Sequence, residues 1–302
     1  MRVGTEPAFE AGPAGEHTAD GTTVRSRPGR RDDRSGLSGA VREDRYRIDG
    51  DCVDELMPAV VVRPARATET RFLPALAGSG MYVHVNAATS ADGKLSTRRR
   101  EQVAISGDED FARVDRLRAE VDAVAVGVGT VLADDPSLVR HDGAHREAER
   151  GDVPPPARVV VDSRGRTPPD ASILDGEPTT YLLAADGLAA ERERALNAAG
   201  ATVLRAGDAA TSGRVDIEAG LSALENHGVR RLLVEGGGEL IFSLFDAGLV
   251  DRLTVYVGSV VLGGRDAPTL ADGKGFVEGF PAPSLAGVER LDDGVLLRYD
   301  VP

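Results

Sequence analysis

From residue 81 onward, short apolar runs alternate with amphipathic stretches. Leu232, Leu233 and Val234 form a run of the kind found in a strand that is covered on both faces. Three glycines follow this run, and then a stretch with the apolar spacing of a helix. The same pattern predicts further strands at 82–88, 121–128, 158–162, 179–184, 202–205 and 253–257, helices at about 107–120, 188–199 and 216–226, and a closing antiparallel pair at 287–291 and 295–299. Strands that alternate with helices and end in an antiparallel pair predict an α/β fold with a mixed sheet flanked by helices.

The helix at about 107–120 has a recognisable start. Ser106 and Glu109 have the spacing of a capping box, in which each side chain binds the backbone N–H of the other residue. Phe111, Val114 and Leu117 recur at helical spacing. We therefore expect these three side chains to form the buried face of the helix.

Arg118 lies on the same stripe, seven residues after Phe111. An unpaired guanidinium among apolar side chains would cost free energy. Two explanations remain open at this point: Arg118 binds the phosphate of a substrate, or it pairs with a structural carboxylate such as Asp122.

Two segments lack the alternating pattern. Residues 1–80 are rich in Gly, Pro, Ala, Arg and Asp, and such a mixture buries too little apolar surface to offset the entropy of ordering. We expect a disordered extension there, or an upstream stretch that is not translated if the natural start is Met81, and a single domain over 81–302. The polar, proline-rich stretch at 142–157 is expected to be a surface insertion that need not be ordered.

Charge and composition narrow the possible partners. The formal net charge is −13, which argues against nucleic acid or an anionic membrane surface as the main partner. Only Lys94 and Lys274 are lysines, and together with the acidity this suggests the high-salt cytoplasm of a halophilic cell. The single cysteine, Cys52, allows neither an intrachain disulfide nor a cysteine-based metal site, and a reducing cytoplasm is the simplest compartment. No apolar run approaches the ~20 residues of a membrane span.

The three-glycine turn carries the first candidate chemistry. Glu235 stands where the apolar strand leaves the sheet, followed by Gly236, Gly237 and Gly238. Glycines leave backbone N–H groups uncovered, and the positive end of the next helix points to the same place. The turn is therefore suited to a phosphate or pyrophosphate, although a tight turn without a ligand has the same sequence. The spacing is not that of the ordinary dinucleotide fingerprint.

Three predicted strands end in turns of this kind, at 127–130, 162–164 and 235–238. Small residues and hydroxyls at several strand ends suit a long anionic nucleotide that lies along the edge of the sheet. Arg164 and Arg166 could bind a 2′-phosphate, or could equally be solvated surface charges.

Other polar residues have simpler interpretations. Asp135 precedes Pro136 and is expected to form a structural turn, and His84 on the first strand is expected to be structural. No serine, histidine and aspartate order, no cysteine nucleophile and no histidine-rich metal cluster emerges. No metal is expected.

The ordered motifs together resemble the reductase domain family of riboflavin biosynthesis, and within it the stand-alone archaeal reductases. The resemblance rests on residues 85–94, 116–120, 126–138, 159–163 and 233–238, and covers nearly all of 81–302. It implies a dihydrofolate-reductase-like fold, a homodimer, and NADPH as hydride donor, with NADH possible. It also implies a phosphorylated aminopyrimidine substrate, 2,5-diamino-6-ribosylamino-4(3H)-pyrimidinone 5′-phosphate, whose ribosyl group is reduced to the ribitylamino product.

The resemblance also assigns residues to the two ligands. The residues implied at the cofactor are Ala88, Thr130, Asp134, Ser163, Gly237, Gly238, Glu239, Leu240, Ile241, Phe242 and Ser243. The residues implied at the substrate are Arg118, Leu138 and Glu235, and Gln102 could hydrogen-bond the substrate. Glu235 could orient the pyrimidine, transfer a proton or stabilise cationic imine character; we favour orientation, because a carboxylate matches the adjacent N–H donors of an aminopyrimidine.

The chain departs from the family pattern in two places. Leu138 is followed by Val139, Arg140 and His141 where the family often has a different run, so Arg140 has no clear phosphate-binding role. Ala104 stands where bacterial relatives carry a stacking tryptophan.

One cysteine cannot supply the zinc deaminase of bifunctional relatives, so we expect reduction without deamination. The alternatives are a dihydrofolate-reductase-like pterin reductase and a non-catalytic nucleotide-binding module.

Overall fold

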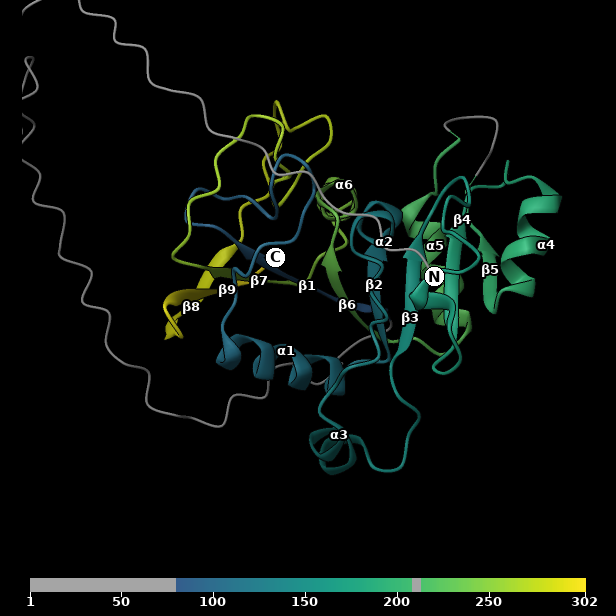
Figure 1. The fold of residues 1–302 in the computed structure, drawn as a ribbon, viewed down its shortest axis with the longest axis horizontal. Helices are drawn as coiled ribbons and strands as arrows, with labels where there is room; N and C mark the ends of the chain where they lie inside the picture. The colour runs from purple at the N-terminus through teal and green to yellow at the C-terminus, as the bar shows by residue number, and fades with distance from the viewer. Residues whose placement is uncertain (1–79, 208–212) are drawn as a thin grey trace, which may run out of the picture. The chain divides into compact units, whose positions relative to one another are not determined.

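The computed structural model describes residues 80–207 and 213–302 (Figure 1). The extension expected over residues 1–80 lies outside the described residues, except for its last position. The elements in chain order are β1 (Tyr82–Thr89), α1 (Asp108–Glu120), β2 (Ala123–Gly127), α2 (Val128–Asp134), α3 (Gly143–Arg150), β3 (Ala157–Val161), the 3₁₀ turn η1 (Ser172–Leu174), β4 (Thr180–Ala184), α4 (Ala190–Ala198), β5 (Ala201–Arg205), α5 (Ile217–Asn226), β6 (Arg231–Gly236), α6 (Gly238–Asp246), β7 (Arg252–Val257), β8 (Ser284–Leu291) and β9 (Gly294–Asp300).

The strands of the described residues form one mixed sheet in the order β5-β4-β3-β2-β6-β1-β7-β9-β8. The seven strands from β5 to β7 pair in parallel. The last hairpin, β8 and β9, joins β7 in antiparallel pairing. The mixed sheet flanked by helices is the architecture that the sequence predicts. Because parallel strands point the same way, the ends of β3, β2, β6 and β1 meet along one edge.

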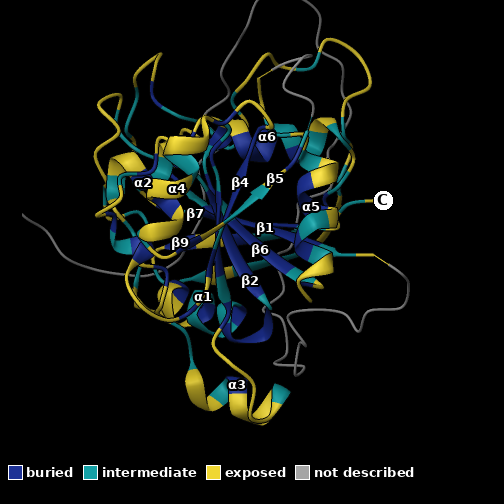
Figure 2. Ribbon diagram, turned by 90° about the vertical axis from the view of Figure 1, so that its right-hand side faces the viewer, coloured by how far each residue is buried: buried dark blue, intermediate teal, exposed yellow. Residues whose placement is uncertain are grey.

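Each face of the sheet carries its own apolar core, because successive strand residues point to opposite faces. On β2, Val124 and Val126 pack with residues of α1, α2 and α4. Ala123 and Ala125 pack with residues of α5 and α6 on the other face. Figure 2 shows α2 and α4 on one side of the fan of buried strands and α5 on the other. Strands buried on both faces explain the apolar runs in the sequence.

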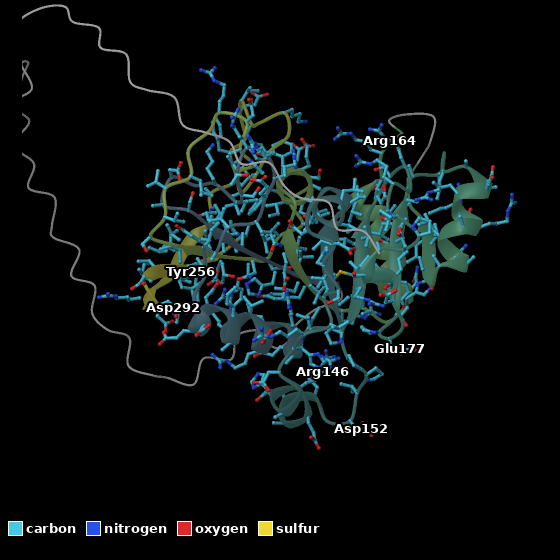
Figure 3. All side chains as sticks on the ribbon, viewed as in Figure 1. Arg146, Asp152, Arg164, Glu177, Tyr256 and Asp292 are labelled. Atoms are coloured by element: carbon cyan, nitrogen blue, oxygen red, sulfur yellow. The ribbon has the colours of Figure 1, made fainter. Side chains whose placement is uncertain are left out.

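Helix α1 begins as expected, but its N-terminal cap is not the capping box predicted at Ser106 and Glu109. The N-cap residue is Gly107, which makes no side-chain cap hydrogen bond. Instead, the Asp292 carboxylate in the β8–β9 turn accepts hydrogen bonds from the backbone N–H groups of Glu109 (3.1 Å) and Asp110 (3.0 Å) (Figure 3). Ser106 Oγ donates to the Asp110 carboxylate at 2.6 Å. The cap therefore comes from a residue 183 positions away, which no local pattern reveals.

Of the three side chains expected on the buried face of α1, Leu117 is buried and Val114 is partly buried, but Phe111 is exposed. Phe111 is 47% exposed, and the buried residues of the helix include Asp110, Arg113 and Leu117. Arg113 donates to Asn86 on β1 at 2.8 Å and forms an ion pair with Asp110 at 2.7 Å. The sheet under this part of α1 is polar, so the helix is rotated to pair charges there rather than to bury its phenylalanine.

The region beneath α1 includes the buried His84. His84 Nε2 lies 3.0 Å from Thr254 Oγ1, and Thr254 donates to Asn86 at 2.7 Å. Burial, with the charges of Arg252 and Arg113, lowers the pKa of His84 to about 3. Its side chain is neutral and part of the polar core, which agrees with the structural role expected for it.

The insertion at 142–157 is ordered, contrary to the expectation that it need not be. It contains α3, whose Arg146 donates to the backbone carbonyls of Ala119 (2.8 Å) and Val121 (2.9 Å). Arg150 pairs with Asp122 and donates to Val121 O. These arginines supply donors to the carbonyl groups that the C-terminus of α1 leaves without partners. The polar sequence is therefore used for docking onto α1.

Candidate functional site

Four of the residues predicted at the site lie on neighbouring strands at one edge of the sheet. Ala88 lies near the end of β1, and Glu235 lies near the end of β6. Thr130 lies in α2, directly after β2, and Ser163 follows β3. Because β3, β2, β6 and β1 are neighbours in that order, the structure brings these residues to one edge. Ligands of parallel α/β sheets bind at this edge.

A β-bulge positions Glu235 between α1 and the end of the sheet. Val234 pairs with Ala125 and Gly236 pairs with Val126, so Glu235 is an extra residue on β6 without a counterpart on β2. A bulge bends its strand and changes the direction of the extra side chain. The bulge therefore separates Glu235 from the regular ladder at the point where a ligand would be recognised.

Arg118 and Glu235 form a bidentate pair across these elements. Arg118 Nε donates to Glu235 Oε1 at 2.7 Å and Nη2 donates to Oε2 at 2.6 Å. The two side chains are only 16% and 11% exposed. Burial acts to lower the pKa of Arg118, but Glu235 and Asp115 outweigh it, and the net pKa is raised. The guanidinium stays charged, and a bidentate pair of this geometry fixes the orientation of the Glu235 side chain.

Two further residues complete this cluster: Asp115, which the sequence analysis did not find, and Arg140, for which it found no clear phosphate-binding role. Asp115 Oδ1 lies 3.9 Å from Arg118 Nη1, and Asp115 Oδ2 accepts a hydrogen bond from Arg140 Nε at 2.6 Å. The backbone carbonyl of Arg140 accepts a hydrogen bond from Arg118 Nη1 at 3.1 Å. The i,i+3 spacing of Asp115 and Arg118 on a helix was the available signal.

Asp122, the structural partner considered for Arg118, has other contacts. Its carboxylate pairs with Arg150 and accepts the backbone N–H groups of Arg230 and Arg231, both at 2.8 Å. Of the two explanations weighed for Arg118, pairing with Asp122 is therefore wrong.

The segment after α2 joins the site through Leu138. Leu138 is buried in the core beside α1 and adopts a left-handed φ of 52°. Asp134 is the last residue of α2 and is partly buried. Asp135 has the structural role expected for it, because its carboxylate accepts the backbone N–H and the hydroxyl of Ser172, both at 2.8 Å.

The glycine turn leads directly into α6. Gly237 has a left-handed φ of 70° and is the N-cap of the helix. A Cβ atom at Gly238 would lie 2.5 Å from the Thr269 carbonyl oxygen, and a Cβ atom at Gly237 would lie 3.7 Å from Thr130 Oγ1. The first backbone N–H groups of a helix have no partner within it. The turn thus lies beside the Thr130 hydroxyl at Gly237 and packs closely on the Thr269 carbonyl and the Asp272 carboxylate at Gly238.

Only part of the predicted 237–243 segment can face a ligand with its side chains. Leu240 and Ile241 are buried in the core beneath the sheet, and Phe242 packs against Phe276 with ring centroids 4.8 Å apart. Ser243 Oγ donates to the Glu239 carbonyl at 2.8 Å. The N-terminal turn of α6 is therefore the part that can reach a bound anion.

The turn after β3 is built around Asp162. Its fully buried carboxylate accepts the backbone N–H of Thr167 at 2.7 Å and the Thr167 hydroxyl at 2.8 Å. Ser163 Oγ accepts the backbone N–H of Val215 at 3.0 Å. Arg166 lies 4.0 Å from Asp162, and Arg164 extends outward from the turn (Figure 3). These arginines remain exposed at the β3 end of the site.

Gln102 lies on the exposed loop between β1 and α1. Within residues 80–207 and 213–302, no hydrogen bond joins its side chain to the Arg118–Glu235 pair, so its predicted contact with substrate remains a prediction. In the same part of the chain, no group of three or more His, Cys, Asp or Glu side chains is arranged to hold a metal ion. No helix there is both long and apolar enough to cross a membrane.

Comparison with known proteins identifies the family. The model of the RibD C-terminal domain matches residues 81–297. The chain belongs to the RibD C-terminal domain family. A relative from Archaeoglobus fulgidus, named 2,5-diamino-6-ribosylamino-4(3H)-pyrimidinone 5′-phosphate reductase, is 45% identical over 217 residues, which are 70% of this chain and 94% of that protein. A relative of the same name from Methanothermobacter thermautotrophicus is 42% identical over 197 residues, 65% of this chain and 86% of that one.

Solved structures of the RibD family share the fold. RibD of Acinetobacter baumannii superposes with a TM-score of 0.60 at 26% identity, over 74% of this chain and 58% of that one. The riboflavin biosynthesis reductase of Saccharomyces cerevisiae gives a TM-score of 0.55 at 20% identity, over 74% of this chain and 90% of that chain. The family expected from the sequence motifs is therefore correct.

Proposed function

We propose that this protein reduces the ribosyl group of 2,5-diamino-6-ribosylamino-4(3H)-pyrimidinone 5′-phosphate, with NADPH as the hydride donor. The observation that carries the proposal is the bidentate Arg118–Glu235 pair, which stands at the sheet edge directly before the glycine turn. The order of these elements on the sheet supports a polar substrate subsite beside an anion-binding turn. The two close archaeal relatives are named for this reaction.

The residues present fit a dinucleotide. Gly237 and Gly238 leave backbone N–H groups open at the start of α6, and this end of the helix is positive. A side chain at Gly238 would clash with the Thr269 carbonyl oxygen and the Asp272 carboxylate, so this position requires glycine for the turn to keep its shape. Thr130 and Ser163 would add hydroxyls along the same edge, with Ala88 at the β1 end and Asp134 at the end of α2. When bound, NADPH supplies a hydride.

The main role of the protein in this reaction is to align C1′ of the substrate with the hydride donor. Opening of the ribosylamine gives an imine; a hydride then adds to C1′ and a proton to the nitrogen, which yields the ribitylamine. Glu235 would accept hydrogen bonds from the amino groups of the pyrimidine and so fix the position of C1′. Both carboxyl oxygens of Glu235 already accept hydrogen bonds from Arg118, which supports orientation over proton transfer as its role.

Arg118 would support this alignment by contacting both Glu235 and the backbone of Arg140. Its Nε and Nη2 hold Glu235, while its Nη1 is held by the carbonyl of Arg140. Leu138, buried beside α1, would close the apolar side of the substrate subsite. Arg118 would then contact the substrate without leaving Glu235 unpaired.

Four further properties belong to the proposal. NADPH is preferred over NADH, supported by the exposed Arg164 and Arg166 beside Ser163, which suit a 2′-phosphate. A homodimer is supported by exposed aliphatic side chains on the last hairpin, such as Leu285. A cytoplasmic, high-salt setting is supported by the net charge of −13 and the single cysteine.

The test is an anaerobic assay of the purified protein with NADPH or NADH and three acceptors. We expect oxidation of NADPH with the ribosylaminopyrimidine phosphate and none with a dihydropterin or without acceptor. Oxidation with the pterin alone would make the protein a pterin reductase. Binding of NADPH without oxidation by any acceptor would make it a non-catalytic binding module.

A further inference from the structure

The loop between β1 and α1 carries a run of three arginines, Arg98, Arg99 and Arg100, in a chain with a net charge of −13. All three are exposed, and so is Arg265 in the loop after β7. A Cβ atom at Gly264 would lie 3.4 Å from Arg98 Cβ, so the two loops are in contact. We call these four residues the arginine rim.

The rim has no carboxylate partner in the part of the chain that the structure describes. Ten other arginines there lie within 4.0 Å of a carboxylate oxygen. The acids next to the rim in sequence, Glu101 and Asp266, form no ion pair with it. In an acidic protein in which ten described arginines have carboxylate partners, four unpaired guanidinium groups on adjoining loops form a local positive surface.

The backbone of the rim is fixed. Thr97 Oγ1 accepts the backbone N–H groups of Arg99 (3.2 Å) and Glu101 (3.3 Å), and Arg100 N donates to the Thr97 carbonyl at 2.8 Å. Arg100 adopts a left-handed φ of 63°, which is uncommon for a residue with a side chain. The arginines therefore project from a closed turn, and little ordering of the backbone is needed when they bind a ligand.

The loop that carries Arg98, Arg99 and Arg100 begins beside the segment that packs on the glycine turn. Leu95 N donates to the Pro268 carbonyl at 2.9 Å, and Lys94 forms a β-bridge with Thr269. Thr269 in turn packs on Gly238. Figure 1 shows the loop after β1, in blue, and the loop after β7, in yellow-green, together near α6. The rim thus stands on the β1 and β7 side of the cradle, opposite Arg164 and Arg166.

We propose that Arg99 and Arg100 of the arginine rim bind a phosphate monoester of a ligand of this site. This rests on the proposed function, which supplies two such groups: the 2′-phosphate of NADPH and the 5′-phosphate of the substrate. Guanidinium groups match phosphate oxygens bidentately, and Arg118, held by Glu235 and Arg140, has few donors left for a phosphate. The pyrophosphate remains with the glycine turn.

The test compares the double variant R99Q/R100Q with the control R194Q/R290Q, which removes two exposed arginines from α4 and β8. Dissociation constants are measured for NADPH, for NADH, for the substrate and for its dephosphorylated form. Binding of the cofactors is measured by nicotinamide fluorescence, and binding of the substrates is measured by calorimetry. The measurements are made in 1 M KCl, where long-range electrostatic attraction is screened. Any loss of affinity then reflects direct contact between the arginines and the ligand.

We expect binding of one phosphorylated ligand to weaken about tenfold, while its counterpart without that phosphate keeps its affinity. A selective loss for NADPH over NADH assigns the 2′-phosphate, and a selective loss for the phosphorylated substrate assigns the 5′-phosphate. R99K/R100K should restore part of the affinity. The proposal is overturned if no affinity falls below that of the control, or if a ligand and its dephosphorylated counterpart weaken equally. Thermal unfolding of both variants checks folding.

Failure of this inference can be told apart from failure of the proposed function. The binding comparison needs no turnover, so it can be made on a protein that reduces nothing. If the unaltered protein turns over the substrate and the rim variant binds every ligand normally, only the inference is wrong.

Discussion

Replacing Glu235 with Gln tests the central pair directly. Gln keeps the shape of the side chain but turns one acceptor oxygen into an N–H donor that faces Arg118. One of the two hydrogen bonds, at 2.7 and 2.6 Å, is therefore lost together with the charge. A hydrogen bond to a charged group contributes about 1.5–3 kcal/mol. If that energy aligns the substrate, kcat/KM should fall by about 10- to 150-fold.

The assay is steady-state oxidation of NADPH, followed by absorbance, combined with a binding measurement for NADPH. We expect the dissociation constant of NADPH to change by less than about threefold, because Glu235 is assigned to the substrate side. A dissociation constant that rises in step with the fall in kcat/KM would refute this reasoning.

A double-mutant cycle with Arg118→Gln separates substrate contact from structural pairing. If Glu235 only neutralises Arg118, the double variant should recover activity relative to E235Q, because no unpaired charge remains. If both residues align the substrate, the double variant should be at least as slow as either single variant. Far-ultraviolet circular dichroism of the three variants controls for folding.

Four other outcomes are expected. Gly237→Val should weaken NADPH binding by at least tenfold and leave substrate binding unchanged, because a branched side chain at a φ of 70° distorts the turn; equal loss of both ligands in calorimetry would contradict this. Asp292→Ala removes the cap of α1 and should lower the free energy of unfolding by about 0.5–2 kcal/mol, measured by denaturant titration, and an unchanged midpoint would disprove the capping role. Because burial, with Arg252 and Arg113, lowers the pKa of His84 to about 3 from the ordinary 6.5, the unfolded chain binds this proton first on acidification. The stability that His84 contributes is complete above about pH 6.5 and is lost as the pH falls toward 3, so His84→Leu should flatten that slope in urea titrations at several pH values. Finally, dialysis from 2 M KCl to low salt should destabilise a protein of net charge −13, and a melting temperature that ignores salt would argue against a halophilic origin.

Much of the fold could be predicted because its signals are local. The strands from β1 to β7 are apolar runs, since both faces of the sheet are covered, and glycine or aspartate turns separate the elements. The errors arose where the determining contact is distant. The cap of α1 comes from Asp292, and the rotation that exposes Phe111 depends on polar residues of β1 and β7. The polar composition of 142–157 left open whether this segment is ordered, because it cannot show that Arg146 would bind the carbonyls of α1.

The candidate site could be predicted from the sequence only in part. Glu235 followed from its place between an apolar strand and the glycines, and the ends of neighbouring parallel strands had to meet. The partner of Arg118 could not be chosen, because Asp122 and Glu235 are both plausible carboxylates in a sequence. The pairing depends on how α1 crosses β6 and on the bulge at Glu235. Both are properties of the assembled sheet.

Helix α1 is fastened at both ends by residues that lie later in the chain. Asp292 binds its first turn, and Arg146 binds its last carbonyls. During synthesis on the ribosome, α1 emerges long before Asp292. The backbone N–H groups at its N-terminus therefore lack their hydrogen-bond acceptor until the β8–β9 hairpin has formed. Arg118 sits on this helix, and its alignment with Glu235 should therefore mature only after the last strands have been released. We therefore expect a nascent chain that is stalled before residue 292 to bind a dinucleotide while its substrate pocket is still incomplete.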